Sequence, residues 1–104
     1  MPKGSHSVSI LQGKEKVCYL TGRMDNLHKH HIYPGPWRKA SDKHGFWVWI
    51  TGEWHNIAPY SLHRGGWRIK KQLQRECQQK FLETHTPEEW RAIINENYLD
   101  EVMD

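Results

Sequence analysis

Histidines crowd one stretch of this 104-residue chain, and that many imidazole side chains together favour a hydrolytic metal site. Imidazole titrates near neutral pH, so it can take a proton from a water molecule. It is also a good ligand for zinc, nickel and iron. A divalent cation can hold a scissile phosphate and neutralise the charge on the leaving oxygen. Besides His44, five of the eight histidines lie between residues 27 and 63: His28, His30, His31, His55 and His63.

The adjacent pair of histidines can divide the two chemical tasks. Successive side chains of a strand point to opposite faces, but at the frayed end of a strand two neighbours can reach one site. We therefore expect His30 to bind a metal ion and His31 to act as the general base on water. His55 and His63 are the further candidate metal ligands. Asn56 is an alternative ligand, or it orients the base.

Two short strands on either side of a basic bridge are predicted to carry these residues. The first spans 27–33 and stops at Pro34, because proline cannot donate a hydrogen bond to a strand ladder. The bridge over 37–45 is expected to be irregular. The second strand spans 46–50, and its alternation separates two groups of side chains. Phe46, Val48 and Ile50 share one face, and Trp47 and Trp49 share the other.

A helix is predicted over 67–82, because apolar residues recur there at every fourth position. The residues before it, 53–60, are expected to form a loop or a short helical turn. Strand, excursion, strand, loop and helix is the order of a ββα-metal unit, which we expect over 27–82. The apolar stripe of the helix consists of Ile69, Leu73, Cys77 and Phe81.

The flanking segments are expected to pack this unit. Alternating residues predict an N-terminal hairpin with strands at 7–11 and 16–20. A C-terminal helix is predicted over 86–97, because Thr86 and Glu89 form a capping-box pattern. Residues 1–6 are expected to be disordered. The length predicts one domain over residues 1–104.

Several segments resemble the small phage-type HNH endonucleases and the HNH-like recombination enhancement function nucleases. The similarity covers most of the chain and continues to NENYL near the C-terminus. It implies an α+β fold, a small ββα-metal (HNH or His-Me finger) domain with an N-terminal hairpin and C-terminal helices. The segments are CYLTG (18–22), LHKHHIYPG (27–35), RKASDKHGFWVWI (38–50), WHN (54–56) and LH (62–63).

The resemblance also implies roles for individual residues. It makes His31 the general base. It makes two histidines metal ligands: His30, which precedes the base, and His55, which follows the second strand. His63 matches a later histidine of the family. Many relatives have Cys-x-x-Cys where this chain has one cysteine, so no structural zinc knuckle is expected. The middle Asn of the HNH signature is missing, and Ser41 or Asp42 lies in that region.

Charge is distributed unevenly, which fits either a nucleic acid as partner or basic residues that only solvate a helix face. Residues 1–80 hold 14 Lys and Arg against 5 Asp and Glu, whereas residues 81–104 hold 1 against 7. A positive field around the histidines would concentrate a polyanion there. Contacts to the phosphate backbone give affinity without sequence choice, so low specificity for DNA sequence is expected. The candidate contact residues are Arg38, Lys39, Arg64, Arg68, Lys71 and Arg75.

These observations predict a metal-dependent endonuclease that hydrolyses DNA phosphodiester bonds, with Mg, Mn, Ni or Zn as cofactor. The alternative is a non-catalytic, metal-stabilised nucleic-acid-binding module of the same fold; a small interaction protein whose histidines bind nothing is a further one. No apolar run approaches the roughly 18 residues of a membrane span. Two distant cysteines form no disulfide framework, so a reduced, cytoplasmic setting is expected. The resemblance implies that this is the cytoplasm of a bacterium or a phage-infected host cell.

Overall fold

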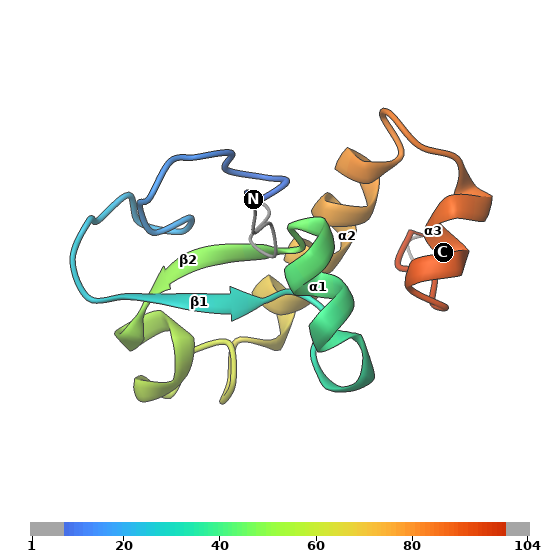
Figure 1. The fold of residues 1–104 in the computed structure, drawn as a ribbon. Helices are drawn as coiled ribbons and strands as arrows, with labels where there is room; N and C mark the ends of the chain where they lie inside the picture. The colour runs from blue at the N-terminus through green and yellow to red at the C-terminus, as the bar shows by residue number, and fades with distance from the viewer. Residues whose placement is uncertain (1–7, 100–104) are drawn as a thin grey trace.

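The computed structural model describes residues 8–99, which form two antiparallel strands with helices packed around them (Figure 1). The expected α+β class is confirmed at this level, whereas the expectation for residues 1–6 lies outside the described residues. None of the helices in residues 8–99 has the length and apolar character needed to cross a membrane. In chain order the elements are β1 (Leu27–His31), η1 (Gly35–Trp37), α1 (Arg38–His44), β2 (Trp47–Thr51), η2 (Glu53–Ile57), α2 (Trp67–Phe81) and α3 (Pro87–Ile93).

Within residues 8–99 the sheet consists of β1 and β2, and its register places the histidine pair beside the core. His30 lies opposite Val48, and His31 lies opposite Trp47. Phe46, Val48 and Ile50 are fully buried, as their shared face predicts. His30 and Val48 therefore look toward the core, while His31 belongs to the opposite face, with Trp47.

The hydrophobic core lies where α2 and α3 pack against the buried face of the sheet. Leu73, Cys77 and Phe81 from α2 are buried, as the predicted stripe requires. Trp90 from α3 is buried as well, and its ring lies 5.5 Å from that of Phe46. The core thus fixes α2 behind the strand that carries the histidine pair.

The irregular bridge expected over 37–45 is wrong, because these residues form the tail of η1 and the helix α1. Pro36 lies in the first turn of η1, where its missing N–H costs nothing. Gly45 ends α1 in the left-handed conformation with φ of 78°, and its N–H bonds Ser41 O. The excursion between the strands is therefore an ordered element that fixes the residues following His31.

The expected N-terminal hairpin is also wrong for the described part of the segment. One isolated bridge, between Ser9 and Gly13, replaces it. The Ser9 hydroxyl accepts hydrogen bonds from the N–H groups of Leu11 and Gln12, and such local bonds favour turns over a strand ladder. The segment instead lies along β2, where the N–H of Tyr19 donates to Trp49 O at 2.8 Å (Figure 1).

The C-terminal helix begins as predicted but ends early. Thr86 and Glu89 form the full capping box at the start of α3. The helix was expected to reach residue 97, yet it ends at Ile93, and Ile94 is extended with φ of −118° and ψ of 112°. Ile94 is fully buried, so ending the helix there lets its side chain join the core. The helical periodicity could not reveal this tertiary preference.

Candidate metal centre

His30 is a buried imidazole without a hydrogen-bond partner. Its side chain is 1% exposed. Neither of its ring nitrogens has a partner among the described residues. Burial lowers the pKa of His30 to about 3, and the charges that His55 and His63 would carry add to this shift. A buried polar group left unpaired costs about 1–3 kcal/mol, so the ring calls for a partner such as a metal ion.

Two further histidines converge on His30. The ring centroid of His30 lies 5.5 Å from that of His55 and 5.4 Å from that of His63. The Nε2 atoms of His55 and His63 are 3.1 Å apart. One nitrogen from each of the three rings lies within 4.8 Å of the others, so the three histidines can hold one metal ion. Imidazole nitrogens are ordinary ligands of zinc and other late transition metals, and the donor set fits such an ion.

The pKa shifts of the three candidate ligands favour the neutral imidazole, which has a lone pair free for a metal ion. Burial is the main cause that lowers the pKa of His55, to about 4, and the neighbouring histidines contribute. Burial lowers the pKa of His63 as well, and Lys70 adds to the effect. Because a metal ligand must be deprotonated, these directions favour metal binding over protonation.

Two of the ligands are brought together by a short, locally bonded segment. His55 lies on η2, a π-helical turn in which the N–H of Ala58 bonds Glu53 O. The chain then doubles back, and the N–H of His63 donates to His55 O at 3.1 Å. This backbone bond places the two side chains beside each other. Single π-helical turns are frequent at functional sites.

Two glycines let the chain leave this turn and enter α2. A Cβ at Gly65 would lie 2.4 Å from Pro59 O, and one at Gly66 would lie 2.5 Å from Tyr60 O. Both distances are too short for any side chain, so the close approach requires glycine.

His31 is held by Asp42, which decides between Ser41 and Asp42 as its neighbour. His31 Nε2 lies 2.9 Å from Asp42 Oδ1. The Ser41 hydroxyl donates instead to Tyr33 O at 3.0 Å. Lys29 Nζ lies 2.8 Å from the same Asp42 oxygen, and its hydrogen bond is the main cause that lowers the pKa of Asp42. The ionised carboxylate accepts from Nε2–H, which leaves the lone pair of His31 on Nδ1.

His31 and two of the candidate ligands share one hollow. This hollow has a volume of about 210 Å³. His31 reaches it from the end of β1 although His30 points into the core from the same strand. Cationic side chains stand at its edge, which favours an anion inside it. The lining residues are Lys29, His31, Pro34, Gly35, Arg38, His55 and His63.

The other residues predicted for the site are spread more widely. Asn56 is exposed on η2 and is not among the described residues that line the hollow. Arg38 lines the hollow. Arg64 is exposed, and its Nη1 donates to Ile57 O at 2.9 Å. Lys39 on α1 is exposed.

The remaining predicted contact residues lie on α2. Arg68 and Lys71 are exposed, and Arg75 is half-buried. The spacing of three and then four residues puts all three on one side of the helix. The Arg68 guanidinium lies 5.2 Å from the centre of the Trp67 ring.

Two residues near the site were not assigned roles from the sequence. Lys29 shares Asp42 with His31. His28 Nδ1 lies 3.1 Å from His55 Nδ1. A spacing of two residues puts His28 and His30 on the same face of a strand, and this was the signal that pointed to His28.

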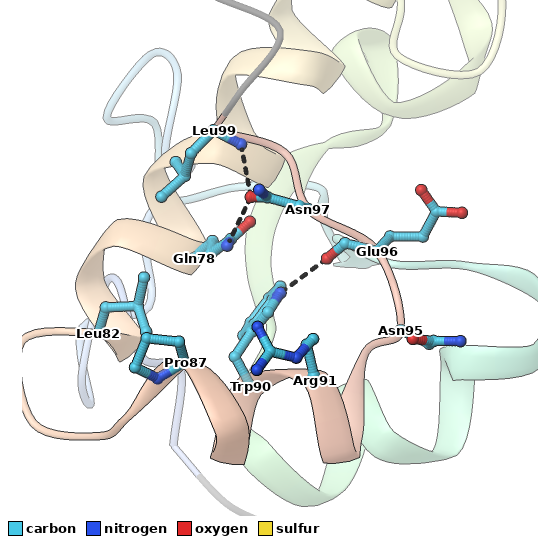
Figure 2. Close-up of a pocket in the computed structure, with 9 residues that line it drawn as sticks. All are labelled: Gln78, Leu82, Pro87, Trp90, Arg91, Asn95, Glu96, Asn97 and Leu99. Atoms are coloured by element: carbon cyan, nitrogen blue, oxygen red, sulfur yellow. Dashed lines mark hydrogen bonds between the residues drawn. The ribbon is translucent and has the colours of Figure 1, made fainter.

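A second hollow, of about 300 Å³, lies between the end of α2, α3 and the chain that follows (Figure 2). Its lining contains neither a histidine nor a cysteine. Its polar groups bond one another: Trp90 Nε1 donates to Glu96 O, and Gln78 Nε2 donates to Asn97 Oδ1 (Figure 2). It shares no lining residue with the histidine hollow. Of these two hollows, the one lined by histidines is therefore the candidate metal site.

Comparisons of the sequence with protein-family models, with curated proteins and with solved structures found no match. Support for a function therefore comes from the arrangement of side chains in this one structure. The histidine cluster and the pair of His31 and Asp42 are the features that bear on it.

Proposed function

We propose that the protein is a metal-dependent endonuclease of the HNH type, which hydrolyses DNA phosphodiester bonds with low sequence specificity. One observation carries the proposal. Three histidine nitrogens lie within 4.8 Å of one another, and two of these histidines share a hollow with His31. Metal-assisted hydrolysis needs a cation site and a proton acceptor side by side, and this arrangement supplies both.

The order of the elements supports the same class. A ββα-metal unit begins with a strand that carries the base and one ligand. A second strand follows, then a turn with two more ligands, and then a helix. Here these parts are β1, β2, the turn from η2 to His63, and α2. His30, His55 and His63 would hold the ion. Three imidazoles suit zinc or nickel better than magnesium, which prefers oxygen ligands.

The side chains around the hollow can be assigned separate tasks. His31 takes a proton on Nδ1 from the attacking water, because its Nε2–H already donates a hydrogen bond to Asp42. Asp42 also stabilises the imidazolium that forms, as the carboxylate of an Asp-His pair does. Arg38 and Lys29 line the hollow and would bind phosphate oxygens. When bound, the metal ion supplies positive charge to the scissile phosphate and to the leaving oxygen.

The basic surface would bring the substrate to this hollow. Arg68, Lys71 and Arg75 lie on one side of α2, and they offer backbone contacts without base readout. Lys29 and Arg38 line the hollow itself and add positive charge beside the histidines. We therefore expect sequence-tolerant binding that weakens steeply as the salt concentration rises.

Nicking of supercoiled plasmid DNA tests the proposal directly. Purified protein is incubated with Zn, Ni, Mn or Mg, and His31→Ala should lower the rate by about 100-fold to 10,000-fold, the usual share of a general base. His85→Ala is the matched control, because His85 is exposed and stacks on Phe81 rather than joining the cluster. Full activity of folded His31→Ala, or no cleavage with any of these ions, would overturn the proposal.

A further inference from the structure

The two ring nitrogens of His55 have different neighbours. Its Nε2 lies 3.1 Å from Nε2 of His63, and both residues belong to the group of histidines that could hold a metal ion. Its Nδ1 lies 3.1 Å from Nδ1 of His28, and the two rings meet edge to face at 89°. An imidazole whose Nε2 binds a metal ion carries its hydrogen on Nδ1. His55 would therefore donate through Nδ1, and the atom placed to accept is His28 Nδ1.

We propose that His28 is a positioning residue of the metal centre, which accepts the Nδ1 hydrogen bond of His55 and so fixes Nε2 of His55 as the ligand atom. This inference rests on the proposed metal centre. Metal-bound histidines usually donate their second N–H to a carboxylate, a carbonyl or a water molecule. Here a neutral imidazole takes that place.

The geometry separates this role from direct metal binding. His28 meets the Nδ1 edge of the His55 ring, whereas the ion would lie at the Nε2 edge. The described nitrogens that lie within 4.8 Å of one another come from His30, His55 and His63. His28 therefore stands behind His55 as seen from the ion.

Gly52 has no side chain and so leaves room for the His28 ring in this position. A Cβ on Gly52 would lie 3.0 Å from both Cε1 and Nε2 of His28, and 3.0 Å from Asn26 Nδ2. Gly52 has φ of −55° and ψ of −35°, an ordinary helical conformation that alanine adopts without strain. A methyl group at this position would therefore act mainly by pressing on His28 and Asn26.

Metal affinity, measured by competition with a chelating dye, tests the inference without any nuclease assay. His28→Phe keeps an aromatic ring but removes the acceptor, and it should weaken Zn binding by about 10-fold to 100-fold, as removal of such partners typically does. His28→Asn should restore affinity close to that of the wild type, because its side-chain oxygen can accept in place of Nδ1. His85→Ala controls for loss of an unrelated histidine. Thermal unfolding of each variant without metal checks that the fold is kept.

A double-mutant cycle adds a second, independent readout. Gly52→Ala should weaken Zn binding in the wild type, and its effect should be much smaller in the His28→Ala background, where only the contact with Asn26 remains. Equal weakening in both backgrounds would contradict a pathway through His28.

The outcomes separate this inference from the proposed function. Wild-type affinity in His28→Phe, with binding lost in His55→Ala, would overturn the inference and leave the metal centre intact. A failure of His28→Asn to restore binding would overturn the acceptor role as well. The absence of Zn binding by the wild type would overturn the metal centre, and the inference with it.

Discussion

His30 occupies a position where an apolar side chain would pack without penalty. It faces Val48 across the sheet, is 1% exposed, and has two ring nitrogens without described partners. Burying polar atoms in this way lowers stability unless a ligand satisfies them. The residue is thus better explained by what it binds than by what it packs against.

Replacing His30 with leucine should stabilise the metal-free protein. His30→Leu removes two unsatisfied nitrogens, and the free energy of unfolding should rise by about 1–3 kcal/mol. Urea denaturation in the presence of a chelator measures this change, with His85→Leu as the control at an exposed site. Zn binding should be abolished in the same variant. A clear fall in stability would contradict the view that the nitrogens of His30 lack partners.

The metal-free protein should lose stability in mild acid. The pKa of His30 is lowered from 6.5 to about 3 by burial, so the unfolded chain takes up a proton between these values and the folded protein does not. The free energy of unfolding therefore falls as the pH drops below about 6.5, and His30 alone accounts for about 2 kcal/mol between pH 7 and pH 5. His55 shifts the same way.

Denaturation curves at several pH values, with chelator present, check this slope. In His30→Leu the loss of stability between pH 7 and pH 5 should shrink, because that titrating group is gone. An unchanged slope in the variant would show that His30 is not responsible.

At the scale of elements, the strands and α2 were predictable because local patterns and tertiary packing agree there. The alternation from Phe46 to Ile50 matches the buried face of β2, and the stripe from Ile69 to Phe81 matches the packed side of α2. The start of α3 follows from the local hydrogen bonds of Thr86 and Glu89. In each case the pattern that forms the element lies within a short stretch of the sequence.

The failures share the opposite cause. The Ser9 region bonds β2 rather than a neighbouring strand, and α3 stops where Ile94 finds the core. The site shows the same division. Residue types indicated the three possible ligands, but the pairing of Asp42 with His31 depends on α1, which was expected to be irregular. A contact between residues of different elements leaves no repeating pattern in the sequence, so the sequence could not predict it.

The basic side of α2 should set the affinity for DNA. Replacing Arg68 and Lys71 with glutamine should weaken duplex binding and reduce the slope of log affinity against log salt by about 0.9 for each phosphate that is no longer neutralised. The control is Lys80→Gln with Arg91→Gln, which removes the same charge from residues that pair with Glu83 and Glu88. Fluorescence anisotropy across a salt series gives both numbers. Equal slopes for the two double variants would assign DNA binding to another surface.

At the scale of the whole molecule, acidic and basic side chains lie in different parts of the structure. Among the described residues, 81–99 carry 4 acidic side chains against 1 basic one, and α3 lies at the opposite side of the molecule from η2 (Figure 1). Lys29 and Arg38 line the histidine hollow, and Arg68, Lys71 and Arg75 lie on α2. A polyanion would therefore approach the histidines and avoid α3.

Metal removal should leave a folded protein without activity. The core around Phe46, Phe81 and Trp90 is a cluster of hydrophobic side chains that contains none of the three candidate ligands. A free Zn concentration of 100 times the dissociation constant should then add about 2.7 kcal/mol to the free energy of unfolding. Circular dichroism after chelation, followed by thermal unfolding with and without Zn, measures both effects. Unfolding on chelation would favour the non-catalytic module, in which the metal ion is structural.

A crystal structure of the protein grown with Zn, with the ion located by its anomalous scattering, would decide whether the three histidines form a metal centre. We predict one ion bound by nitrogens of His30, His55 and His63 at about 2.0–2.1 Å, with His31 facing it across the hollow. An ion held by other residues, or no anomalous peak among these three histidines, would contradict the proposed metal centre.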